Sequence, residues 1–94
     1  MKFDIFYEHQ LPRPWEEDSE YKLLQNSLSQ IELADRLGYD YAWMVEHHFL
    51  EEYSHASSPE TFLGAASQRT ENIRLGYGIV QLTTNQPHRV AEKV

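Results

Sequence analysis

Three short apolar segments alternate with three segments of helical pattern along this chain. The apolar segments span residues 2–8, 41–45 and 73–82, and the helical ones span residues 19–37, 58 to about 72, and 87 onward. Tyr41–Val45 lacks polar alternation, which is typical of a strand buried on both faces of a parallel sheet. The order β-α-β-α-β-α predicts an α/β fold with parallel strands. Two architectures fit it: a doubly wound open sheet, and the first three βα units of a (β/α)8 barrel.

The helical segments carry recognisable start and stop signals. Apolar side chains recur at three- and four-residue steps between residues 19 and 37, which predicts an amphipathic helix. Gly38 supplies the left-handed residue that commonly ends a helix. Ser58 and Pro59 are typical of a helix start, and Pro87 opens the third helix. We interpret the acidic residues at positions 16, 17, 18 and 20 as a solvated helix entrance rather than a cation site.

Composition excludes several classes of partner. The 94 residues permit one domain with a modest core, to which Phe3, Trp43 and Phe62 are expected to contribute. A formal net charge of −7 repels phosphate backbones, so no nucleic acid is expected. No apolar run approaches the roughly 20 residues that span a bilayer, so no membrane is expected. The absence of cysteine excludes disulfides and thiol chemistry in this chain, and it fits a cytoplasmic location.

The segment Glu46-His47-His48-Phe49 lies just past the end of the second predicted strand. Functional groups of parallel α/β folds collect at the carboxyl ends of strands, and histidine can move protons near neutral pH. The alternative is that both histidines are polar loop residues satisfied by hydrogen bonds. A metal site that also uses His9 or His55 is disfavoured, because adjacent strand residues point to opposite faces and no metal-ligand spacing is present.

Two glycines interrupt the third apolar segment, at Gly76 and Gly78. They resemble a phosphate-binding glycine loop only weakly, because Gln81 stands where the third glycine of G-x-G-x-x-G belongs. Glycine weakens a strand unless the backbone must bend or approach another group closely. Two interpretations therefore stay open: close approach to a flat ligand, or a bulge in a curved sheet.

Five segments share their order and spacing with one enzyme family. They are FDIF at residues 3–6, ADRLGYD at 34–40, WMVEHHF at 43–49, IRLGYGIV at 73–80 and PHRVAEKV at 87–94. On these segments the chain resembles the bacterial luciferase-like flavin-dependent monooxygenases from end to end. The resemblance implies that residues 1–94 are the N-terminal part of a luciferase-like monooxygenase domain. A complete (β/α)8 TIM barrel takes about 250 residues, so the barrel would be incomplete.

The resemblance also implies a cofactor and site residues. The cofactor would be reduced FMN, with the deazaflavin F420 as the alternative. His47 matches the histidine that acts as catalytic acid or base, and His48 beside it would support the flavin or the substrate. Gly78–Ile79 matches a non-proline cis peptide whose bulge backs the flavin ring, and Glu46 joins these two as a cofactor-binding residue. No metal is implied.

The function implied by the resemblance is oxidation of an aldehyde, a ketone or another small organic substrate by O2 and reduced flavin. A flavin reductase would supply the flavin, and the protein would form a homo- or heterodimer. The chain would be an enzyme as part of a full-length monooxygenase and inactive as an isolated fragment. The alternative is a non-enzymatic short paralogue that acts as a partner or assembly subunit of a full-length barrel.

Overall fold

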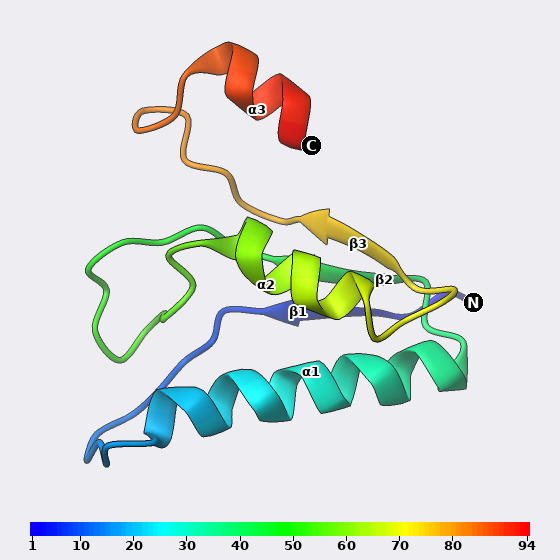
Figure 1. Ribbon diagram of the computed structural model, residues 1–94, viewed down its shortest axis with the longest axis horizontal. Coiled ribbons are helices and arrows are strands. Elements are labelled where there is room, and N and C mark those ends of the chain that lie inside the picture. Colours follow the sequence, from blue (N-terminus) through cyan, green and yellow to red (C-terminus); the bar gives the residue numbers. More distant parts are fainter.

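The computed structural model describes all 94 residues and follows the predicted order of elements (Figure 1). Their bounds are β1 Asp4–Tyr7, α1 Ser19–Leu37, β2 Tyr41–Met44, α2 Pro59–Ser67, β3 Arg74–Tyr77 and α3 Pro87–Lys93. The strands form one parallel sheet in the order β1-β2-β3. The predicted parallel α/β arrangement is therefore confirmed, and β1 and β3 each have one free edge.

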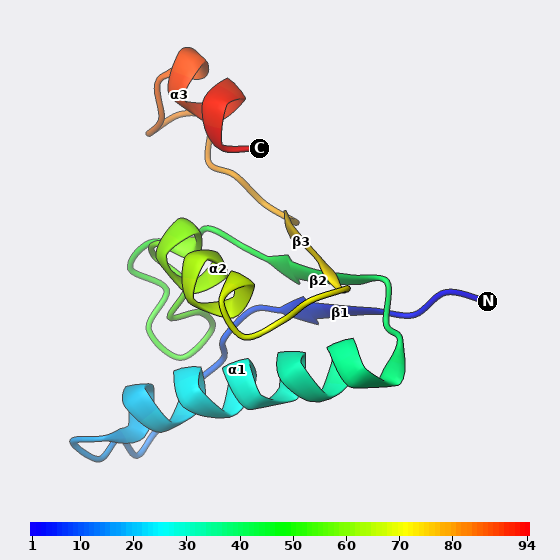
Figure 2. The same ribbon diagram turned by 45° about the vertical axis from the view of Figure 1, so that its right-hand side comes forward.

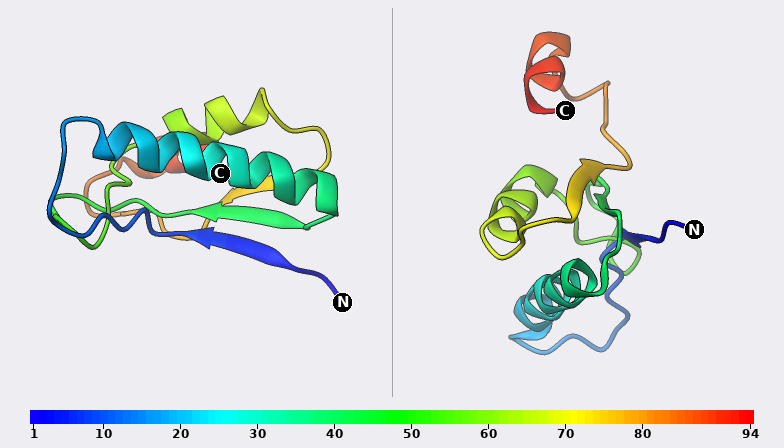
Figure 3. Two further views of the ribbon diagram at one scale, coloured as in Figure 1. Left: turned by 90° about the horizontal axis from the view of Figure 1, so that it is seen from below. Right: turned by 90° about the vertical axis from the view of Figure 1, so that its right-hand side faces the viewer.

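Both longer helices pack on the same face of the sheet. In Figure 3, α1 and α2 lie on one side of the strands and no helix lies on the other. Ala42 and Met44 of β2 are buried against the helices, whereas Tyr41 and Trp43 on the opposite face are only half-buried. The expectation of a strand buried on both faces is therefore not met within this chain.

The hydrophobic core lies between the sheet and these two helices. Phe62 belongs to it as expected. Phe3 is 58% exposed and Trp43 is half-buried on the opposite face of the sheet, so the expected place of these two in the core is wrong. The position of Phe3 explains the difference, because it precedes β1 at the free edge of the sheet. The buried apolar side chains are those of Tyr7, Leu28, Ile31, Ala34, Ala42, Met44, Val45, Ala56, Phe62, Leu63, Ala66 and Ile73.

The third helix stands apart from the rest of the fold. Figures 1 and 2 show α3 well away from the sheet, and none of its residues is buried. It is joined to α2 by an ion pair of 3.8 Å between Lys93 and Glu60. No helix of the protein combines the length and the apolar character needed to cross a membrane.

The third strand is shorter than predicted. It ends at Tyr77 rather than at Leu82, because the chain bulges at the next two residues. The backbone N–H groups of Gly78 and Ile79 both donate to the carbonyl oxygen of Met44, at 2.6 and 3.5 Å. Two residues facing one is the pattern of a β-bulge, and it ends regular pairing.

Aromatic rings on the bare face of the sheet explain the two glycines. A Cβ atom on Gly76 would lie 2.5 Å from the ring of Trp43, and one on Gly78 would lie 2.5 Å from the ring of Phe6. The Trp43 ring is fixed, because it stacks on Tyr41 at 4.4 Å and its Nε1 donates to Asp4 Oδ2 at 3.0 Å. The two glycines therefore make room for aromatic side chains of the chain itself, Trp43 and Phe6.

We expect Gly76→Ala to lower the free energy of unfolding of the full-length protein by about 1–3 kcal/mol, because the new methyl group overlaps a ring that cannot move. Gly64→Ala is the matched control. Gly64 lies in α2, and a Cβ atom added there would have no other atom within 4 Å. Gly64→Ala should therefore stabilise the protein by up to about 1 kcal/mol. Urea denaturation measures both changes. Equal effects of the two substitutions would contradict the packing argument.

One carboxylate joins the end of α1 to the start of β3. Asp35 accepts hydrogen bonds from the backbone N–H groups of Glu71, Asn72 and Ile73, at 2.9, 2.8 and 2.6 Å. The bonds from Glu71, Ile73 and Asn72 stabilise the charged form and lower the pKa of Asp35 below its ordinary value of 3.8. The turn that leads into β3 therefore depends on the ionised side chain.

We expect Asp35→Ala to lower the midpoint of thermal unfolding at pH 7, and Asp35→Asn to lower it less because one acceptor oxygen remains. Since the folded-state pKa is depressed, the contribution is present above the ordinary value of 3.8 and is lost as the pH falls through the lower folded-state value. The midpoints of wild type and Asp35→Ala should therefore converge in acid. A difference that stays constant down to pH 2 would rule out this role of the carboxylate.

Candidate functional site

The segment that follows β2 is hydrogen-bonded to the residue Ile79 after β3 and to the connection that leads into α2. The backbone N–H of Glu46 donates to the carbonyl oxygen of Ile79 at 3.0 Å, and that of His47 donates to Ala56 at 2.9 Å. These bonds bring His47 and His48 to the same edge as the Gly78–Ile79 bulge. All five site residues predicted from the sequence therefore lie in one region.

Glu46 is the polar centre of this region. It is 5% exposed, and its carboxylate oxygens contact His48 Nε2 at 3.0 Å, Asn85 Nδ2 at 3.0 and 3.2 Å and the backbone N–H of Gln81 at 3.1 Å. Burial alone would raise the pKa of Glu46, but these hydrogen bonds and the charge of Lys93 outweigh it and lower the pKa. Both oxygens are therefore engaged by the chain itself.

His47 faces a different carboxylate. Its Nε2 lies 3.4 Å from Glu8 Oε2, and the two side chains are 17% and 22% exposed. Its ring also meets that of Tyr53 in a T-shaped arrangement, at 5.9 Å between centroids. Glu8 follows β1 directly, and β1 pairs in register with β2, so both residues leave the sheet at the same edge.

Sequence reasoning did not single out Glu8 or Asn85. The predicted parallel pairing of the first two strands could have indicated Glu8, because the residues after neighbouring parallel strands meet at one edge. Asn85 carries no such signal, since it lies in the irregular segment between β3 and α3. The acidic helix entrance is also not purely solvated, because Glu20 Oε1 contacts His55 Nδ1 at 3.1 Å.

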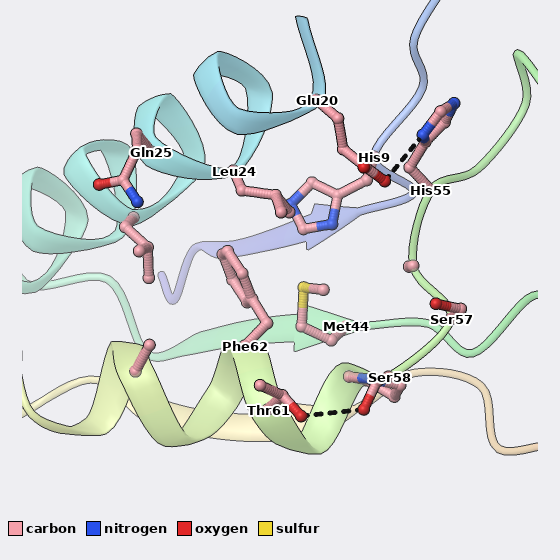
Figure 4. A pocket seen from close by; sticks show the side chains of 14 residues that line it. His9, Glu20, Leu24, Gln25, Met44, His55, Ser57, Ser58, Thr61 and Phe62 are labelled. Atoms are coloured by element: carbon pink, nitrogen blue, oxygen red, sulfur yellow. Dashed lines mark hydrogen bonds and ion pairs between the residues drawn. The ribbon is translucent and has the colours of Figure 1, made fainter. Parts of the chain in front are cut away.

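His9 lines a separate pocket between α1 and α2, which Figure 4 shows together with Leu24 and Phe62. The cavity measures about 380 Å³. His9 is 4% exposed, and neither ring nitrogen has a hydrogen-bond partner. Burial, reinforced by the nearby His55, lowers the pKa of His9 to about 4, so its ring is neutral near pH 7. No cluster of three or more histidines and carboxylates has the geometry of a metal site.

The peptide bond between Gly78 and Ile79 is trans, so the expected non-proline cis bond at this position is wrong for this structure. The cis peptide bond of the chain is Arg13–Pro14. In this trans segment, the N–H groups of Gly78 and Ile79 share the Met44 carbonyl oxygen. The Phe6 ring occupies the space beside Gly78.

The bare face of the sheet presents aromatic surface of a kind that suits a flat ring. The bare face of the sheet offers Phe6, which is 53% exposed, beside the Gly78 bulge and near the edge that carries His47. Because the Phe6 ring itself fills the space beside Gly78, a flat ring would stack on the exposed face of Phe6. In (β/α)8 barrels, phosphate groups are usually bound after strands 7 and 8, which lie outside these three strands.

Comparisons with known proteins show which family the chain resembles. A family model described as luciferase-like monooxygenase matches residues 1–94. The chain is 38% identical over 84 residues to limonene 1,2-monooxygenase of Rhodococcus erythropolis, a match that covers 86% of the chain and 21% of that protein. It is 40% identical over 70 residues to 4-hydroxyprotoasukamycin monooxygenase of Streptomyces nodosus subsp. asukaensis, covering 74% of the chain and 19% of that protein.

Solved structures share the fold. The oxygenating constituent of 3,6-diketocamphane monooxygenase from Pseudomonas putida, a complex with FMN, matches with a TM-score of 0.82 at 21% identity over 100% of the chain and 25% of its own. Monooxygenase RslO1 of Streptomyces bottropensis matches with a TM-score of 0.80 at 35% identity over 99% of the chain and 28% of its own. These likenesses confirm the predicted fold class, three βα units of a (β/α)8 barrel. The chain spans about a fifth of the length of the curated relatives it matches.

Proposed function

Because the chain belongs to the luciferase-like monooxygenase family, we propose that it forms the N-terminal part of a flavin-dependent monooxygenase. The proposed reaction is oxidation of an aldehyde, a ketone or another small organic substrate by O2 and reduced flavin. Three βα units do not close a barrel, so we expect activity in the full-length protein and not in residues 1–94 alone.

The convergence of His47, His48 and Gly78–Ile79 at one edge of the sheet carries this proposal. Such edges hold the active sites of (β/α)8 enzymes. Reduced flavin would supply the electrons for O2 activation. Gly78 and Ile79 would support its ring, and Glu46 would act through the loop that it holds, because its own oxygens are already hydrogen-bonded.

His47 is the residue that we propose as catalytic acid or base. Histidine exchanges protons near neutral pH, and the His47 ring keeps partial access to solvent at 17% exposure. His48 would have a supporting role beside it, since its Nε2 is held by Glu46 at 3.0 Å. His47 would therefore move the proton, and His48 would stabilise the loop and contact the flavin or the substrate.

FMN is the flavin that we propose first. The Pseudomonas putida neighbour of the same fold is an FMN complex, which supports this choice, and F420 is the alternative. Anaerobic titration of the full-length protein with reduced FMN and with reduced F420, followed by flavin absorbance, decides between them. We expect saturable binding of FMN; saturation with F420 alone would overturn the choice of FMN.

The monooxygenase reaction itself is tested with isotopically labelled oxygen. The full-length protein, a flavin reductase and a panel of aldehydes and ketones are incubated under ¹⁸O2, and products are analysed by mass spectrometry. We expect one ¹⁸O atom per product molecule. O2 consumption that gives only hydrogen peroxide across the panel would contradict monooxygenation of these substrate classes.

We also propose a dimer and a reductase partner. Leu33 and Leu37 on α1 are 48% and 67% exposed, which leaves apolar surface for a barrel neighbour or a second subunit. The reductase follows from the need for reduced flavin at each turnover. Sedimentation of the full-length protein measures the oligomeric state, and a monomer at micromolar concentration would rule out the dimer.

A further inference from the structure

Glu8 presents a carboxylate that has no hydrogen-bond donor within the protein. Its Oε2 atom is shielded from solvent and forms no hydrogen bond, and its charged contact is His47 Nε2 at 3.4 Å. A shielded carboxylate oxygen without a partner is costly, because desolvation is not compensated. The nearby imidazole is the group able to compensate it, by presenting an N–H or a positive charge.

The protein holds both members of this pair in place through one short segment. The Ser54 hydroxyl donates to the carbonyl oxygen of Glu8 at 2.6 Å, and the His55 N–H donates to that of His9 at 3.0 Å. The His47 N–H donates to Ala56 at 2.9 Å. Residues 54–56 therefore fix the backbone of both Glu8 and His47. Side chains that pair on a free surface are not held in this way.

The other charged groups around His47 already have partners. From α1, Glu20 contacts His55 at 3.1 Å. In the loop after β2, Glu51 contacts the guanidinium of Arg13 at 3.2 Å, and the neighbouring Glu46 contacts His48 at 3.0 Å. The Tyr53 ring meets that of His47 in a T-shaped arrangement. Glu8 is therefore the carboxylate that faces this imidazole.

We propose that Glu8 is a positioning residue for His47: its carboxylate keeps the ring hydrogen on Nε2, so that Nδ1 is the atom that exchanges a proton with the reacting group. The inference rests on the proposed role of His47 as acid or base. A neutral imidazole has one N–H and one acceptor nitrogen, and a carboxylate selects the N–H. The Nδ1 atom of His47 has no hydrogen-bond partner in the chain. It is also not one of the buried polar atoms, so it stays accessible to a reacting group.

In the proposed role, the proton enters and leaves the His47 ring at Nδ1. When Nδ1 takes a proton from the reacting group, the ring becomes an imidazolium cation, with the Glu8 carboxylate beside Nε2. When the ring acts as an acid, the same proton leaves from Nδ1. No proton is transferred to the Glu8 carboxylate in either direction; its place 3.4 Å from Nε2 favours the positively charged ring.

Nitrogen-15 NMR of the imidazole rings in the full-length, flavin-free protein tests this inference without an activity assay. The His47 signals are assigned by their absence in His47→Ala. We expect wild type to show a single tautomer with the hydrogen on Nε2 at pH 8, and Glu8→Leu to show a mixture. Glu20→Leu is the matched control, because it removes the carboxylate of another histidine pair and should leave the His47 signals unchanged.

A His47 spectrum that does not change in Glu8→Leu overturns the inference whatever the activity of the protein. Glu8→Gln guards against misfolding, since it keeps the shape and an acceptor oxygen; it should retain the Nε2 tautomer. In turnover, Glu8→Leu should lose about 10- to 100-fold in kcat with KM little changed. If His47→Ala keeps full activity, the proposed function of His47 fails, and the NMR result still decides on the pair.

Discussion

Replacing His47 by alanine in the full-length protein is expected to lower kcat for the proposed oxygenation by about 10²- to 10⁴-fold, the usual contribution of a positioned acid or base. The His47 imidazole lies at the carboxyl edge of β2, and its Nδ1 has no hydrogen-bond partner in the chain. Substrate binding should change little, because the side chain is small and only part of a larger pocket. Steady-state turnover with reduced flavin and O2 gives kcat and KM separately.

Two other histidines provide the comparison for this substitution. His88→Ala is the matched control, because His88 lies exposed in the first turn of α3, and turnover should stay within about twofold. The turnover of His48→Ala should lie between those of His47→Ala and His88→Ala, since Nε2 of His48 is already bonded to Glu46. A His47→Ala variant with the turnover of His88→Ala would remove His47 from the mechanism and leave the fold assignment untouched.

The sequence pattern was sufficient for the order of elements, because helix periodicity and helix ends are local properties. Gly38 illustrates this: it was predicted to end α1 in the left-handed conformation, and it does so with φ of 82°. Ser58 shows where local rules stop. It occupies the N-cap of α2 as predicted, but its hydroxyl bonds to that of Thr61 at 2.9 Å rather than to a backbone N–H.

Contacts between distant segments could not be predicted in the same way. The space beside Gly76 is filled by Trp43, 33 positions earlier, and that beside Gly78 by Phe6 from two strands away. A glycine within an apolar run shows that something comes close, but it does not identify what. The partner of His47 is a similar case, because Glu8 becomes its neighbour only once β1 and β2 are paired.

Glu46 should contribute more to stability than any other carboxylate of the site. We expect Glu46→Ala to lower the free energy of unfolding of the full-length protein by about 2–4 kcal/mol at pH 7, because it leaves Asn85 and the Gln81 N–H without their buried acceptor. Glu20→Ala is the matched control. It removes another glutamate–histidine pair, but Glu20 is 60% exposed, so its effect should stay below about 1 kcal/mol.

The pH dependence of the Glu46 contribution separates its charge from its packing. The folded-state pKa of Glu46 is lowered, so the contribution is present above its ordinary value of 4.5 and is lost as the pH falls through the lower folded-state value. Urea denaturation of wild type and Glu46→Ala at pH 7 and pH 3 should therefore give a large difference that shrinks in acid. A difference that stays equal at both pH values would mean that packing, not the charge, holds the loop between β3 and α3. In that case Glu46→Gln should be as stable as wild type, and the loop at the edge of the proposed flavin site would depend on shape rather than charge.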